Sequence, residues 1–218
     1  MTLWLSLLVA AAHAKKIEVD IDIGLGPTFD QFSGPVRRDQ TLHYGARLNL
    51  EVIIDKGDIR KLKSRIPPQY RKMAMKLEEV RIRPAWFLLP QTVHLSPKSE
   101  NTGVYGATWE LLGMDVPFVR EPFRLAATAG LPLSVIHVSS DTLPSPTNVV
   151  RLGLSGGGDL EVPITPGFLL GGGWTSLLHI PQPLGSGVFT SGPGRESVWH
   201  VGQAYGQVHV RFPMTIDI

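Results

Sequence analysis

Hydrophobic and polar positions alternate along the chain, first over residues 14–27, AKKIEVDIDIGLGP. Ile17 and Val19 fall on one side of this segment, and Glu18 and Asp20 fall on the other. Successive side chains of a β-strand point to opposite faces of a sheet, so this two-residue period predicts a strand with one apolar and one polar face. What the apolar face contacts, a protein core or another apolar medium, decides the class of the protein.

The same period recurs along the rest of the chain. Together with the first segment, these stretches predict eight strands. They are residues 41–55, a weaker strand over 80–95, and residues 104–112, 123–140, 148–165, 168–180 and 199–212.

The polar faces of these strands hold charged side chains and many glycines, whereas the apolar faces hold few polar residues. A sandwich of two sheets needs the reverse arrangement, with an apolar interior and a charged surface. We therefore predict an all-β fold, a single antiparallel up-and-down barrel whose polar faces point inward. Eight strands leave no wide channel, so we expect a paired mixed-charge network in the interior. Its predicted members are Arg47, Glu51, Glu110, Arg124, Arg151, Glu161, Gln207 and Arg211.

The connections between the strands differ in length on the two sides of the predicted barrel. Residues 26–41, 96–102, 140–147 and 181–197 form Gly/Pro/Ser-rich connections on one side, and residues 113–122 and 165–167 form shorter turns on the other.

With its aromatic residues near the strand ends, the pattern over residues 15–218 resembles the small eight-stranded outer-membrane β-barrel proteins of Gram-negative bacteria. The resemblance implies a location in the outer membrane, with membrane lipid and the outer-membrane assembly machinery as partners. It also implies a structural, adhesive or narrow-conduit role, with the apolar face of residues 17–23 against lipid. The alternative is a soluble barrel, periplasmic or secreted, that binds an apolar ligand inside. The direction of the apolar faces separates these two interpretations.

The N-terminus predicts export. Residues 3–12 form an apolar run, and Ala12-His13-Ala14 matches a small-residue cleavage site followed by Lys15. We therefore expect residues 1–14 to be a signal peptide and residues 15–218 to be the barrel domain.

The connection between the second and third strands is long and basic. Residues 56–83 contain ten Lys and Arg residues against three acidic ones. Helical spacing after Pro67 and Pro68 predicts one basic amphipathic helix around residues 58–79. Such a helix would lie on anionic lipid headgroups; the alternatives are a solvated helix that closes the open barrel end and a helix packed on the sheet. The predicted lipid-facing cations are Lys61, Lys63, Arg65, Arg71, Lys72 and Lys76.

One pair of residues could carry catalysis. His137 and Ser139 lie two apart on one predicted strand, a spacing similar to the catalytic pair of the outer-membrane lipid A deacylases. That resemblance implies a His base and a Ser nucleophile, but the acid expected a strand later is replaced by Arg151. A non-enzymatic protein is the leading hypothesis, with a deacylase-like hydrolase as a further alternative.

Composition and residue spacing also bear on nucleic-acid, metal and phosphate binding. The net charge is only +2, which does not indicate a nucleic-acid partner, and the chain contains no cysteine. The other histidines lack metal-ligand spacing, and neither glycine-rich stretch, 155–159 or 171–173, continues as a phosphate-binding loop. We expect neither a metal nor a cofactor.

Overall fold

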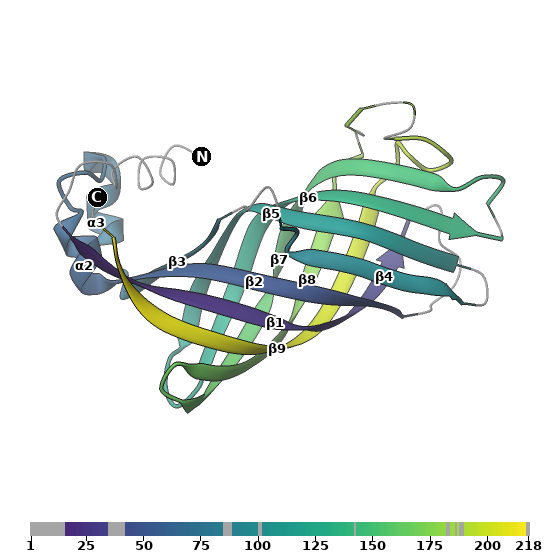
Figure 1. Cartoon of the computed structure of the whole chain (residues 1–218). Helices are drawn as coiled ribbons and strands as arrows, with labels where there is room; N and C mark the ends of the chain where they lie inside the picture. Colours follow the sequence, from purple (N-terminus) through teal and green to yellow (C-terminus); the bar gives the residue numbers. More distant parts are fainter. Residues whose placement is uncertain are drawn as a thin grey trace.

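The computed structural model of the chain is a β-barrel with two short helices at one end (Figure 1). It describes residues 16–34, 42–84, 89–99, 102–141, 143–181, 184–185, 187 and 190–216. The predicted signal peptide, residues 1–14, lies outside the described residues.

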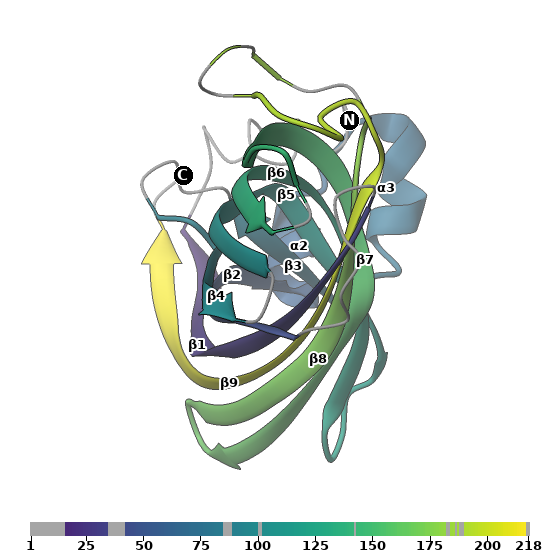
Figure 2. The same cartoon turned by 90° about the vertical axis from the view of Figure 1, so that its right-hand side faces the viewer.

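Nine strands form one antiparallel sheet that closes on itself through the pairing of β9 with β1 (Figure 2). The strands are β1 Ile17–Ser33, β2 His43–Asp55, β3 Glu79–Pro84, β4 Thr92–Ser99, β5 Thr102–Val119, β6 Arg124–Ser140, β7 Thr147–Thr165, β8 Phe168–His179 and β9 Trp199–Ile216.

Two of the nine strands share one position in the barrel, so the ring has eight positions. Both β3 and β4 pair with β2 on one side and with β5 on the other. The sequence predicted a single weak strand over 80–95, and the structure has two strands there, β3 ending at Pro84 and β4 beginning at Thr92. The prediction of an eight-stranded antiparallel barrel is confirmed.

Three strands run well past their predicted ends. β9 runs on to Ile216, β1 to Ser33 and β5 to Val119, so the predicted connections 26–41 and 113–122 begin too early. Pro27 and Pro117 lie within these predicted connections, yet Pro27 pairs with Ala46 and Pro117 with Ala126 in the sheet. The alternation of side chains continues through both prolines, which is the signal that identifies these residues as strand.

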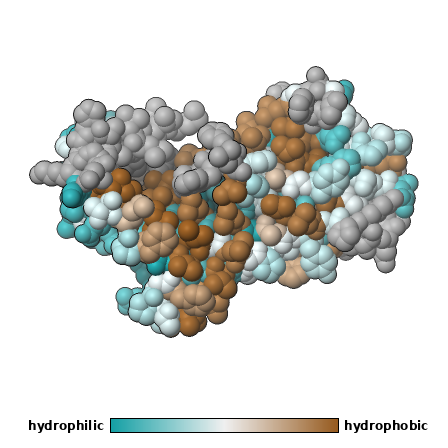
Figure 3. Space-filling model, in the orientation of Figure 1, coloured by the Kyte–Doolittle hydropathy of each residue, from teal (hydrophilic) through white to brown (hydrophobic). Residues whose placement is uncertain are grey.

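The apolar faces point outward and the polar faces point inward. Leu25, Leu170 and Val208 are exposed on the outer wall, whereas Asp22 and Glu51 are almost fully buried inside. Figure 3 shows hydrophobic surface over the region of β1, β2 and β9. A charged interior does not fit a soluble barrel that binds an apolar ligand inside.

The connection between β2 and β3 contains two short helices, α2 Lys56–Lys61 and α3 Pro68–Ala74, in place of the single predicted helix. α3 begins at Pro68, as expected for a proline in a first helical turn. No helix in the described part of the chain is long and apolar enough to cross a membrane.

The helical segment, residues 56–78, packs on the outer wall of the barrel at this end. Ile59 and Ala74 form an apolar cluster with Val80 and Ile82, and partly buried Ile54 packs against it.

Farther along the segment, Leu62 packs against the start of β1. It forms an apolar cluster with Ile17 and Val19, which are only 3% and 2% exposed. The expectation that lipid contacts the whole apolar face of residues 17–23 is therefore wrong at Ile17 and Val19, because Leu62 already covers them.

Candidate functional site

A cluster of ion pairs fills the barrel interior in the half nearer the helical segment. Four arginines meet seven carboxylates there, and the strands that supply them are β1, β2, β3, β5, β6, β7 and β9. We call this group the charge cluster; it consists of Asp22, Glu51, Glu79, Arg81, Arg83, Glu110, Asp115, Arg124, Asp159, Glu161 and Arg211.

Glu161 lies at the centre of the charge cluster. Its Oε1 accepts from Arg81 Nη1 at 2.6 Å and from Arg124 Nη1 at 3.3 Å, and its Oε2 accepts from Arg211 Nη2 at 2.9 Å. These three arginines come from β3, β6 and β9, so one carboxylate of β7 links strands from around the barrel. Its side chain is only 1% exposed.

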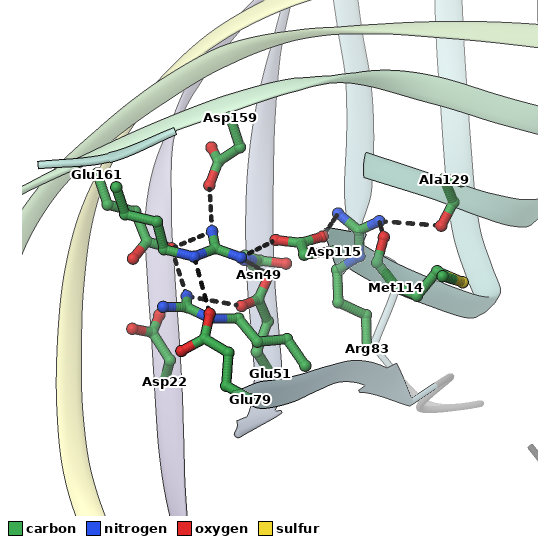
Figure 4. Close-up of polar contacts among 12 residues, drawn as sticks. Asp22, Asn49, Glu51, Glu79, Arg83, Met114, Asp115, Ala129, Asp159 and Glu161 are labelled. Carbon is green, nitrogen blue, oxygen red and sulfur yellow. Dashed lines mark hydrogen bonds and ion pairs between the residues drawn. The ribbon is translucent and has the colours of Figure 1, made fainter. Parts of the chain in front are cut away.

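Two arms extend from this centre, and Figure 4 shows one of them at Arg83. Arg83 contacts Glu110 at 3.1 Å and Asp115 at 3.4 Å, and Asp115 also accepts from Arg124 at 3.2 Å. On the other side, Arg211 donates from Nε and Nη2 to one oxygen of Asp22, at 3.0 and 2.8 Å. Charge-assisted hydrogen bonds of this kind fix side-chain geometry as well as neutralise charge.

The structure brings five of the eight predicted interior residues into the charge cluster. They are Glu51, Glu110, Arg124, Glu161 and Arg211.

The other three predicted residues are buried but make different contacts. Arg47 donates to Gln203 at 3.2 Å and lies over the Tyr205 ring, 4.4 Å from its centroid. Gln207 donates to the Arg47 carbonyl at 3.2 Å. Arg151 lies apart from the cluster at the far end of the barrel, where it donates to the carbonyl of Ser197.

Sequence reasoning missed two arginines of the cluster. Arg81 and Arg83 were counted with the basic helical connection, whereas both lie on β3 and point inward. The signal was present in the stretch EVRIR, residues 79–83, because Val80 and Ile82 alternate with the two arginines.

A chain of hydrogen bonds crosses the interior beyond the charge cluster. We call it the polar chain. Asp30 contacts His94 at 2.6 Å, His94 contacts Thr108 at 2.9 Å, Thr108 contacts Ser134 at 2.8 Å, and Ser134 contacts His179 at 2.8 Å. These side chains come from β1, β4, β5, β6 and β8, so the polar chain links opposite sides of the barrel.

Apolar side chains close the barrel at the far end. We call this group the apolar cap; it consists of Phe32, Val104, Ile136, Val138, Val149, Leu177, Trp199 and Val201.

The connection between β8 and β9 is fastened to the rim beside the cap. Arg151 donates to the carbonyl of Ser197, Trp199 Nε1 donates to the Gly194 carbonyl at 2.9 Å, and Ser191 pairs with Asn148.

One small cavity lies between the charge cluster and the polar chain. It measures about 10 Å³ and is lined in part by Arg47, Gln91 and Thr175. That volume is about what one water molecule needs. Close packing also explains two inward glycines, since a Cβ at Gly24 would lie 2.7 Å from the His209 ring and one at Gly173 would lie 2.7 Å from the Tyr205 hydroxyl.

The predicted lipid-facing cations lie on or beside the two helices. Four of them, Lys61, Lys63, Lys72 and Lys76, are exposed. Arg65 and Arg71 are partly buried, and Arg71 Nε donates to the Ile66 carbonyl at 2.8 Å within the segment.

The beginning and end of the helical segment are tied by an ion pair. The Lys56 ammonium donates to the Glu78 carboxylate, and this contact holds the pKa of Glu78 below its ordinary value.

His137 and Ser139 face outward on β6. His137 stacks on Tyr105, with ring centroids 4.4 Å apart, and its Nδ1 lies 2.7 Å from Asn148 Oδ1. Tyr105 and His137 line an outer-wall groove of about 350 Å³. The structure gives no hydrogen bond between His137 and Ser139 among the described contacts.

A different serine and histidine do meet on the outer wall. Ser176 Oγ lies 2.6 Å from His200 Nε2, and Ser33 Oγ lies 3.3 Å from the other ring nitrogen. Sequence reasoning missed this pair because Ser176 and His200 come from different strands, β8 and β9. Within the described residues, no group of His, Cys, Asp and Glu side chains has the arrangement of a metal site.

Comparisons with known proteins give likenesses of structure only. No protein-family model and no curated protein matches the chain. The crystal structure of Neisserial surface protein A matches over 88% of this chain and 97% of its own, with 12% identity and a TM-score of 0.53.

Two further structures are less similar. Ail of Yersinia pestis matches at 11% identity over 91% of this chain and 100% of its own, with a TM-score of 0.47. The N-terminal β-barrel domain of Pseudomonas aeruginosa OprF matches at 13% identity over 89% and 97%, with a TM-score of 0.44. The closed ring of strands and the match to the Neisserial protein show that this chain has the fold of the small eight-stranded β-barrel proteins of bacterial outer membranes.

Proposed function

We propose that the protein is an integral outer-membrane barrel with a sealed interior, and that it acts through its far rim as a structural or adhesive element. The observation that carries this proposal is the charge cluster, in which Glu161 binds arginines from three other strands. The polar chain and the apolar cap add further buried side chains to the interior, and the cavity between the charge cluster and the polar chain measures about 10 Å³. A sealed interior favours these roles over a narrow conduit.

The outer wall supports the membrane location. Apolar side chains such as Leu170 and Val208 are exposed along the strands, and a closed barrel leaves no unpaired sheet edge in lipid. Aromatic side chains are exposed near both barrel ends, Tyr44 and Tyr105 at the far end and Phe118 at the helical end. Aromatic residues at these two levels are typical of membrane barrels. Insertion would require the outer-membrane assembly machinery as a partner.

The far rim supports an anchored surface role. Ser191 and Ser197, in the connection between β8 and β9, are held by the pairing with Asn148 and by Arg151, so this part of the far rim has a fixed position beside the apolar cap. With the far rim on the outer face of the membrane, the helical segment lies on the periplasmic side.

Conductance tests the sealed interior. The purified full-length protein, folded and heat-modifiable on a gel, is reconstituted into a planar bilayer. We expect no stepwise current, because the ion pairs of the charge cluster join strands across the interior. The double variant Arg124→Ala with Glu161→Ala serves as the comparison and should conduct if it folds. Steady unitary currents from the wild type would exclude the sealed interior and favour the conduit.

Assembly tests the membrane location. Val208 lies on the outer wall near the middle of β9, so Val208→Arg should cost about 2–4 kcal/mol near the bilayer midplane and reduce the heat-modifiable form in outer-membrane fractions. Glu196→Arg, on the exposed rim, is the control and should assemble normally. Equal assembly of the two variants would count against lipid contact at Val208.

A second candidate function rests on the contact between Ser176 and His200. A serine hydroxyl 2.6 Å from an imidazole meets the distance requirement of an activated nucleophile, and both residues face outward. This geometry moves the hydrolase alternative from His137 and Ser139 to Ser176 and His200. A fluorophosphonate probe should label the wild type and spare Ser176→Ala, while Ser139→Ala stays labelled. No labelling of the folded wild type would reject it.

A further inference from the structure

An apolar groove runs along the outer wall over β9, β1 and β2. It measures about 450 Å³ and is lined by apolar side chains of these strands and by Leu89 and Gln91. The strand residues include Ile21, Leu50 and Phe212. Pockets that hold small ligands span about 300–1,000 Å³, so the groove is large enough for part of a lipid chain.

The helical segment lies beside one end of this groove. Leu62 belongs to an apolar cluster against which Ile21 and Val52 pack, and both of these residues also line the groove. The groove therefore has a defined end at the level where the barrel meets its helices.

Two exposed cations are the sequence neighbours of Leu62 at that end. Lys61 and Lys63 flank Leu62 in the sequence, and both are exposed. Lys61 pairs with Asp58 at 2.8 Å, whereas Lys63 has no acidic partner among the described residues. An apolar groove next to an unpaired cation matches a molecule with a hydrocarbon chain and an anionic head.

We propose that this groove is a binding site for one anionic phospholipid of the periplasmic leaflet, with an acyl chain in the groove and the phosphate near Lys63. The inference rests on the proposed membrane location. Two exposed apolar residues of the helical segment agree with it, since Met73 and Leu77 are 52% and 38% exposed beside the basic residues. Apolar and basic side chains together on a short helical segment are typical of contact with a lipid surface.

Native mass spectrometry tests the site on the full-length protein folded in zwitterionic detergent, with phosphatidylglycerol and phosphatidylcholine as the two probes. We expect one phosphatidylglycerol to remain bound per barrel, with clearly weaker retention of phosphatidylcholine. Lys63→Glu should weaken phosphatidylglycerol binding about fivefold or more, since each surface cation near an anionic lipid contributes roughly that factor. Leu50→Trp should abolish one-to-one binding by filling the groove.

Two matched controls separate this site from general effects. Arg195→Glu makes the same charge change at the far rim, and Leu170→Trp enlarges an outward leucine on β8, away from the groove. Both should bind phosphatidylglycerol like the wild type. Equal retention of the two lipids, or equal binding by Lys63→Glu and Arg195→Glu, would overturn the site. The heat-modifiable gel shift of each variant reports the barrel separately, so loss of the lipid site leaves the proposed function standing.

Discussion

The two halves of the barrel interior are filled by different chemistry. The half near the helical segment holds the charge cluster, in which one carboxylate, Glu161, pairs with arginines of three strands. The far half holds the polar chain, in which Asp30 is joined to histidine, threonine and serine side chains, and the apolar cap closes it. Four arginines and seven carboxylates meet in the first half, whereas Asp30 is the one carboxylate of the polar chain.

This difference indicates which part of the barrel is most sensitive to side-chain substitution. A buried charge that loses its partner carries a large desolvation cost, whereas a neutral hydrogen-bonding group that loses one partner costs less. An apolar side chain that loses one methylene costs less again. The same barrel should therefore show graded responses to deletions along its axis.

The largest effect is expected in the charge cluster. Glu161→Ala leaves Arg81, Arg124 and Arg211 without their shared acceptor, and it should lower the free energy of unfolding by about 3–5 kcal/mol. Urea titration of the heat-modifiable form in detergent measures it. Glu196→Ala is the control, because that carboxylate is 75% exposed on the rim. A loss no greater than that of the control would remove the central role given to Glu161.

The barrel and the direction of its faces could be predicted from the sequence, because a two-residue period changes face at every position. The ends of the strands were harder to predict from the sequence. Pro27 and Pro117 fell in predicted connections, although the alternation continues through both, and the pairing of Pro27 with Ala46 and of Pro117 with Ala126 shows that the sheet continues. Ile17 is buried by a contact with Leu62, which lies 45 residues later in the chain. No local sequence pattern predicts such a distant contact.

The second effect is expected in the polar chain. His94→Ala removes contacts to Asp30 and Thr108 in a side chain that is 1% exposed, and it should cost about 1.5–3 kcal/mol. The loss stays below that of Glu161→Ala, because Asp30 keeps Gln203 at 3.0 Å. The same urea titration measures it, with the outward-facing His137→Ala as the control. A cost above that of Glu161→Ala would reverse the order of the two halves.

For the candidate site, the sequence predicted which side chains face the interior better than it predicted which of them meet. The two-residue period placed Glu161 and Arg124 on the inward faces of their strands, and these two residues are direct cross-strand partners in the sheet. The same period could not show that Arg151 lies too far along the barrel to join them, because the position of a residue along the barrel axis depends on the tilt of its strand. Nor could it pair Ser176 with His200, since that contact needs the register between β8 and β9.

The smallest effect is expected in the apolar cap. Ile136 is 3% exposed among Val138, Val149 and other cap residues, so Ile136→Val removes one buried methylene and should cost about 0.5–1.5 kcal/mol. Val135→Ala is the control; it removes two carbons from the next residue on β6, which faces outward and is 42% exposed. In detergent, the outward change should shift the urea midpoint less than the inward one. If Val135→Ala shifts it more, then the apolar cap is not the tightly packed element that closes the far half, and the sealing of the barrel depends on the charge cluster and the polar chain alone.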